Sequence, residues 1–114
     1  CCSNEIVADI LVVGHHGSKT SSRVAFLNAV SATDYVISSG PYKYRDVQLP
    51  DKIIEQTILA RTGSRLFKTY ENDDACKVNP NKIGSDNDEK PGGCNTIKIL
   101  IKPNSTREIT TLSN

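Results

Sequence analysis

The stretch ADILVVGHHGSKTSSRVAFLNAV, residues 8–30, decides the fold, because it joins an apolar run to a glycine turn and then to an amphipathic segment. The run at 8–13 is short and almost continuously apolar, which is typical of a strand that is buried on both faces of a parallel sheet. After the turn HHGSKT, serines suited to a helix cap precede apolar residues at helical spacing. The predicted cap is Ser21 or Ser22, and the predicted apolar stripe is Val24, Leu27 and Val30.

The rest of the chain continues this alternation of strands and helices. Pro50 and Asp51 suit the start of a second helix, which we expect to end at Arg61, just before Gly63. Strands separated by helices indicate βαβ units and a mostly parallel sheet, in which only the last strands are expected to be antiparallel. The further predicted strands are YVISS at 35–39, RLFKTY at 65–70, TIKILIKP at 96–103 and REITTL at 107–112.

Length and composition limit the function classes. With 114 residues, 24% charged residues and a formal net charge of +1, the chain fits one small domain or part of a larger one. This charge provides no general basic field for a polyanion, so contact with nucleic acid would have to be local or metal-assisted. No apolar run approaches the roughly 18 residues of a membrane span, so we expect no membrane contact from this segment itself. The start at Cys1 suggests a cut-out or processed piece.

The cysteines leave two alternatives open. Cys76 and Cys94 bracket residues 77–93 within the polar segment 72–95, which we interpret as an insertion or loop. A disulfide between them would close this loop and would imply an oxidising compartment. Two unrelated thiols are an equal alternative, and the spacing fits no zinc-finger pattern.

The histidines lie where ligands bind in open α/β sheets, beyond the carboxyl end of a strand. Neutral imidazole is a common zinc ligand, and Gly17 permits a sharp turn after His15 and His16. In extended backbone, neighbouring side chains point in opposite directions. We therefore expect only one of the two histidines to bind a metal directly. The alternative is that both histidines only complete a turn.

A phosphate site is a second interpretation of the same turn. A P-loop is excluded, because only two residues separate Gly14 from Gly17 and Ser18 stands between the glycine and Lys19. The turn amides together with Ser18 and Lys19 could still hold a phosphate or another anion. The alternative for the hydroxyl residues, Ser18, Thr20, Ser21 and Ser22, is that they cap backbone groups.

The string HHGSKTSS within residues 8–30, followed by YVISSG, resembles the metallo-β-lactamase-like domain of ComEC-type DNA-uptake proteins and their stand-alone relatives. The resemblance covers residues 5–71 and includes GSRLFKTYEND. It implies an α/β fold, the C-terminal βαβαββ half of an αββα sandwich. Residues 1–114 would then form a single partial domain, completed by the polar segment 72–95 and terminal strands at 96–114.

The resemblance also implies roles for individual residues. The family histidines correspond to His15 and His16, both placed at the catalytic centre, with His16 as the metal ligand. The family continues with Tyr-Gly-His-Pro, where this chain has YKYRDVQLPDK and no further histidine. Tyr44 matches the tyrosine, and Asp46 is the nearest residue that could replace the missing ligand. The residues expected to line the substrate cleft are Ser18, Lys19, Thr20, Ser21 and Tyr44.

The implied activity is metal-dependent hydrolysis of phosphodiester bonds in DNA, with zinc or two divalent metals as cofactor. Two histidines cannot complete such a centre, so we expect an N-terminal half carrying an HxHxDH motif as partner, and an isolated chain that is inactive and self-associates. The alternatives are hydrolysis of another ester, a thioester or a lactam, and a non-catalytic α/β interaction module. A ComEC-type protein would place this segment on the extracytoplasmic face, and a stand-alone hydrolase would be cytoplasmic.

Overall fold

The computed structural model describes residues 6–40, 45–71 and 95–112. Its centre is a parallel sheet of three strands, β2 (Ile10–Val12), β4 (Asp34–Ile37) and β5 (Arg65–Lys68), with β4 between the other two. Both pairings are parallel, as expected when each strand is followed by a crossover connection. The carboxyl ends of all three strands therefore meet at one edge of the sheet.

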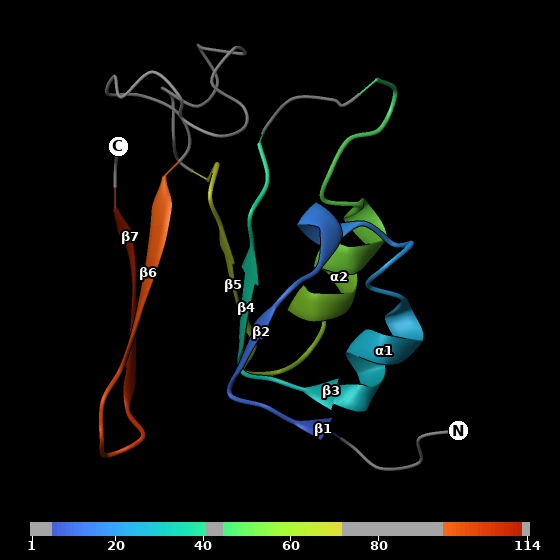
Figure 1. Ribbon diagram of the computed structural model, residues 1–114. Coiled ribbons are helices and arrows are strands. Elements are labelled where there is room, and N and C mark those ends of the chain that lie inside the picture. Colours follow the sequence, from blue (N-terminus) through green and yellow to red (C-terminus); the bar gives the residue numbers. More distant parts are fainter. Residues whose placement is uncertain (1–5, 41–44, 72–94, 113–114) are drawn as a thin grey trace.

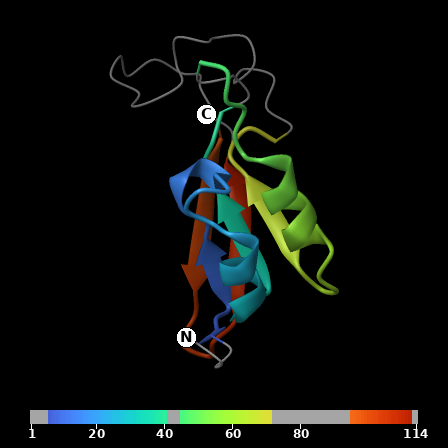
Figure 2. The same cartoon turned by 90° about the vertical axis from the view of Figure 1, so that its right-hand side faces the viewer.

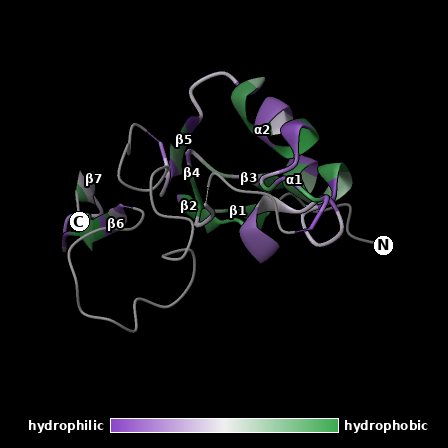
Figure 3. Ribbon diagram, turned by 90° about the horizontal axis from the view of Figure 1, so that it is seen from above, coloured by the Kyte–Doolittle hydropathy of each residue, from purple (hydrophilic) through white to green (hydrophobic). Residues whose placement is uncertain are grey.

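Three layers are visible in Figure 1 and, from above, in Figure 3. Helices α1 (Val24–Ala29) and α2 (Lys52–Leu59) cover one face of the sheet, and an antiparallel hairpin lies on the opposite side. The hairpin consists of β6 (Thr96–Ile101) and β7 (Arg107–Leu112), and Figure 2 shows it running alongside the sheet. The assignment of this arrangement to one half of an αββα sandwich stays a prediction.

The core lies between the sheet and the helices. All four residues of β4 are buried, and Tyr35 and Ile37 belong to the apolar cluster on the helix side. Ile54 and Ile58 of α2, one helical turn apart, pack into the same cluster. Because side chains alternate along a strand, the other two residues of β4 face the hairpin.

The first predicted strand forms, but the expected burial is wrong. Among the described strands, β2 is at the edge of the sheet, and Val12 keeps 64% of its surface exposed. An edge strand has a neighbour on one side only, so its apolar residues are less covered than those of β4. Two short strands were not predicted, β1 (Ile6–Val7) and β3 (Val30–Ser31), which pair in parallel.

Helix α1 differs from its prediction at both ends. It begins after Arg23 rather than after a serine cap, and the Ser22 hydroxyl donates to the Gly14 carbonyl 3.3 Å away. It ends at Ala29, so Val30 is buried in β3 instead of completing a helical stripe. Leu27 is the helix residue that reaches the core.

Pro50 was predicted as the first helical position, but helix α2 begins two residues later, at Lys52, and it ends at Leu59 instead of Arg61. Asp51 takes the N-cap position, and Pro50 precedes it. No helix of the described residues is long and apolar enough to cross a membrane.

Candidate functional site

The histidine turn, residues 14–20, follows β2 at the carboxyl edge of the parallel sheet and contains the short helix η1 (His15–Gly17). The segment after β4 reaches the same edge and provides Ser38 beside the turn. The start of α2 packs against the turn from another side, as Figure 1 shows. The chain thus gathers three separate segments around the histidines.

The backbone of the histidine turn is left-handed. The φ angles of His15, His16 and Gly17 are 50°, 54° and 79°. For residues other than glycine, this conformation costs about 1–2 kcal/mol of free energy each. A Cβ atom at Gly17 would lie 2.5 Å from the Cβ atom of Pro50, so the close approach of α2 also requires glycine.

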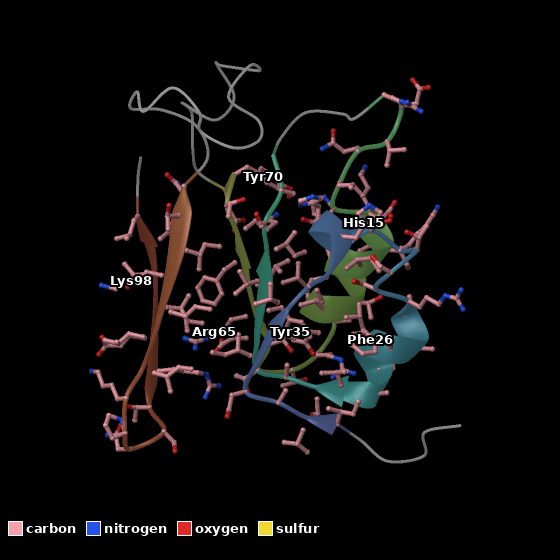
Figure 4. The ribbon with its side chains drawn as sticks, viewed as in Figure 1. His15, Phe26, Tyr35, Arg65, Tyr70 and Lys98 are labelled. Atoms are coloured by element: carbon pink, nitrogen blue, oxygen red, sulfur yellow. The ribbon has the colours of Figure 1, made fainter. Side chains whose placement is uncertain are left out.

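The expectation of an extended backbone at the histidines is therefore wrong. The centroids of the two imidazole rings are 6.3 Å apart, and the ring planes meet at 56°. Both side chains are exposed, and Figure 4 labels His15 at the surface beside α2. Both histidines therefore lie at the surface, and neither enters the core.

His16 is the histidine with a fixed orientation. Its Nδ1 atom lies 2.6 Å from the carbonyl oxygen of Ser38. A carbonyl only accepts hydrogen bonds, so Nδ1 carries the proton and Nε2 of the neutral ring keeps a lone pair. This tautomer presents Nε2 as a potential metal ligand or proton acceptor.

The hydroxyl residues of the turn support its backbone. The Ser18 hydroxyl lies 2.9 Å from that of Thr20 and accepts from the Thr20 amide at 3.3 Å. Ser18 and Ser22 are buried, whereas Lys19 and Ser21 are exposed. The structure thus confirms the backbone-capping interpretation for Ser18 and Ser22, and the proposed substrate contacts of this group stay predictions.

The second half of the predicted metal site is not assembled by the described residues. Tyr44 lies outside them, and Asp46 lies in an exposed turn. Within residues 6–40, 45–71 and 95–112, no group of three or more His, Cys, Asp and Glu side chains could hold a metal ion. Cys76 and Cys94 also lie outside the described part. Pro50 packs on the histidine turn at Gly17.

Comparison with known proteins finds a relative of the chain among competence proteins. Over 67 residues, the chain is 40% identical to Competence protein ComA of Neisseria gonorrhoeae. The match covers 56% of this chain and 9% of ComA, so the chain spans a small part of the length of this relative. No protein-family profile matches the sequence, and no solved structure matches the chain. The chain is related to a competence protein over part of its length.

The structure also contains a charged cluster that sequence patterns did not reveal. Asp34 is fully buried at the start of β4, and both of its oxygens accept from Arg65, at 2.6 and 2.9 Å. Arg107 of the hairpin donates to Asp34 at 2.6 Å and to Asp9 at 3.1 Å. Figure 4 shows Arg65 between β5 and the hairpin. Burial alone raises the pKa of Asp34, but the hydrogen bonds from the two arginines outweigh burial and lower it.

A second missed group lies near the carboxyl end of β5. The Thr69 hydroxyl donates to the Ser39 carbonyl at 2.7 Å and accepts from the Ser39 amide at 3.0 Å. Next to it, Lys68 donates to Glu55 of α2 at 2.9 Å. Burial disfavours the charged lysine, but its contact with Glu55 prevails and raises the pKa of Lys68. These contacts fix the ends of β4 and β5 next to the histidine turn.

Proposed function

We propose that the chain is part of a metal-dependent hydrolase domain that cleaves phosphodiester bonds of DNA in a competence protein with a role in DNA uptake. The similarity to ComA supports the competence relationship. The location of the histidine turn at the carboxyl edge of a parallel sheet supports a ligand-binding role. Metal chemistry and a DNA substrate are the further steps of this proposal.

The single observation that carries the proposal is the orientation of His16. Metal-binding histidines usually donate their second ring N–H to a backbone carbonyl or carboxylate, which fixes the tautomer of the ring. His16 makes this contact with the Ser38 carbonyl and exposes Nε2 on the other side. This contact fixes the ring in an orientation suited to coordination through Nε2.

In this proposal, zinc would be bound at a site that the chain shares with an N-terminal half. His16 would hold the metal, Asp46 is the proposed second ligand, and an N-terminal half with an HxHxDH motif would supply the rest. Zinc, or two divalent ions, would lower the pKa of water and stabilise negative charge on phosphoryl oxygens. His15 would contact the substrate, and the exposed ammonium group of Lys19 would bind a phosphate.

Zinc titration of the chain tests the metal step. We expect zinc to shift the ring resonances of His16 before those of His15 in NMR spectra. His16→Ala should lower zinc affinity at least about tenfold, whereas the matched variant His15→Ala should change it little. Equal zinc affinity of both variants and the unchanged chain would contradict the proposed ligand.

DNA cleavage by the full-length protein tests the activity. His16→Ala should reduce the cleavage rate by about 100-fold or more, because a lost ligand disrupts the metal site. The isolated 114-residue chain should show no turnover. Full activity of His16→Ala would contradict the hydrolase assignment, and cleavage of an ester, thioester or lactam but not of DNA would contradict the substrate.

The apolar surface near β2 supports the proposed partner half. Val7 and Val12 are 83% and 64% exposed, and among the described strands nothing pairs with the outer edge of β2. Without the N-terminal half, we expect this edge to bind a second copy of the chain. Sedimentation equilibrium should show self-association that increases with concentration, and a monomer at all concentrations would contradict it.

A further inference from the structure

Asp51 links helix α2 to the histidine turn through two hydrogen bonds. Its backbone amide donates to the carbonyl of Gly17 at 3.0 Å. Its carboxylate accepts from the backbone amide of Lys19 at 2.7 Å. One residue of α2 therefore holds both backbone groups that flank Ser18, on the chain segment that directly follows the histidines.

This use of the carboxylate is unusual for an N-cap residue. An aspartate at this position ordinarily accepts from an amide in the first turn of its own helix. Asp51 makes no side-chain hydrogen bond to α2, although its backbone carbonyl accepts from the amides of Ile54 and Glu55. The side chain is directed to Lys19 instead, 32 residues away in the sequence.

The histidine turn needs external support because its backbone is strained. Left-handed His15 and His16 together cost about 2–4 kcal/mol, at about 1–2 kcal/mol per residue. Such conformations persist only where the surrounding structure holds them in place. The internal bond from the Ser18 amide to the His15 carbonyl fixes the turn itself, while Asp51 fixes the turn to the rest of the molecule.

We propose that Asp51 is a positioning residue that holds the histidine turn in the conformation in which the His16 ring donates to Ser38. If the contact between Asp51 and Lys19 is lost, the turn can relax and the His16 ring leaves the Ser38 carbonyl. Asp51 thus acts on His16 through its hydrogen bonds to Gly17 and Lys19. The inference deepens the proposed function, because metal binding by the oriented His16 ring is part of that proposal.

Two substitutions separate this role from ordinary helix capping. Asp51→Ser keeps a strong N-cap residue, but its hydroxyl is too short to replace the carboxylate at Lys19. Asp51→Asn keeps a side-chain oxygen that can accept from the Lys19 amide. Glu108→Ser, which removes an exposed carboxylate of the hairpin, is the matched control.

The readout is the tautomer of His16 in metal-free protein, measured from ring ¹⁵N shifts at about pH 8.5, where free imidazole is neutral. We expect the Nδ1-protonated form in the unchanged chain, in Asp51→Asn and in Glu108→Ser. Asp51→Ser should shift His16 toward the mixed tautomers of an unstructured histidine while α2 stays folded. A folded Asp51→Ser variant with an unchanged His16 tautomer would overturn the inference.

Hydrogen exchange in the unchanged chain provides an independent measurement if Asp51→Ser does not fold. The Lys19 amide should exchange at least about tenfold more slowly than an unbonded amide, because the carboxylate holds it. Unprotected Lys19 would overturn the inference. Both measurements are made on metal-free protein. If Asp51→Ser shifts the His16 tautomer but the chain binds no zinc, the role of Asp51 is supported and the proposed function is rejected.

Discussion

The polar side chains at the two ends of β4 differ in burial and in hydrogen bonding. At the start of the strand, Asp34 is 0% exposed, and both carboxylate oxygens are bonded to arginines. Beyond its end, the Ser38 carbonyl holds the exposed ring of His16, whose second nitrogen is left available. A buried charge must be fully paired to be tolerated, whereas a binding site needs groups with unused bonding capacity. The Asp34 end is thus built for stability, and the histidine end is suited to binding.

Removal of the Asp34 carboxylate should have the largest effect on folding. Asp34→Ala leaves Arg65 and Arg107 without their shared partner, and breaking a buried ion pair costs about 3–5 kcal/mol. We expect about 3 kcal/mol, because the Arg65 side chain is 56% exposed and can hydrate. Urea denaturation measures this change. Asp9→Ala, which removes an exposed partner of Arg107, should cost less than about 0.5 kcal/mol, and equal costs would contradict the comparison.

A side chain at Gly17 should have the next largest effect. Gly17→Ala adds a Cβ atom 2.5 Å from Pro50 at a φ of 79°, so the turn or the start of α2 must move. We expect a loss of about 2 kcal/mol in the free energy of unfolding. Gly14→Ala is the matched control, because its added Cβ meets nothing within 4 Å, and it should change stability by less than about 0.5 kcal/mol. Similar losses for both variants would show that the approach of Pro50 is unimportant.

Acid should weaken the Asp34 end selectively. The folded pKa of Asp34 is lowered from 3.8, so its carboxylate stabilises the folded chain above about pH 4, and this contribution is lost as pH falls through the folded pKa. The variant Asp34→Asn lacks the titrating group but keeps a similar shape. The difference in unfolding free energy between the unchanged chain and Asp34→Asn should therefore narrow below about pH 4. A difference that is constant between pH 7 and pH 2 would contradict the lowered pKa.

Local patterns predicted the elements but not how they meet. The apolar run at 8–13 indicated β2, the sequence around Pro50 indicated α2, and the alternation at 96–103 indicated β6, because each depends on neighbouring residues. Burial was predicted less well, since the position of a strand within its sheet depends on distant segments. The edge position of β2 is the clearest example.

The contacts that define both ends of β4 are non-local. Arg65 and Arg107 stand 31 and 73 residues from Asp34, and no spacing in the sequence connects them. The location of the histidines at a strand end was predictable, because a strand followed by a turn defines it. Their left-handed backbone and the reach of Asp51 to Lys19 were not, because ordinary propensities favour extended histidines and a self-capped helix.

The smallest expected effect, at the histidine end, has the opposite sign. His15→Gly removes a left-handed non-glycine residue, whose conformation costs about 1–2 kcal/mol of stability. The greater freedom of glycine in the unfolded chain lowers the stability again by about 0.5–1 kcal/mol. We therefore expect the free energy of unfolding to rise by up to about 1 kcal/mol in urea denaturation. Ser105→Gly, in the β6–β7 connection with a φ of 62°, should give a similar gain. Under the proposed function, only His15→Gly should also slow DNA cleavage by the full-length protein. A His15→Gly chain less stable than the unchanged chain would show that the ring of His15 contributes to folding, and the contrast between the two ends of β4 would then fail.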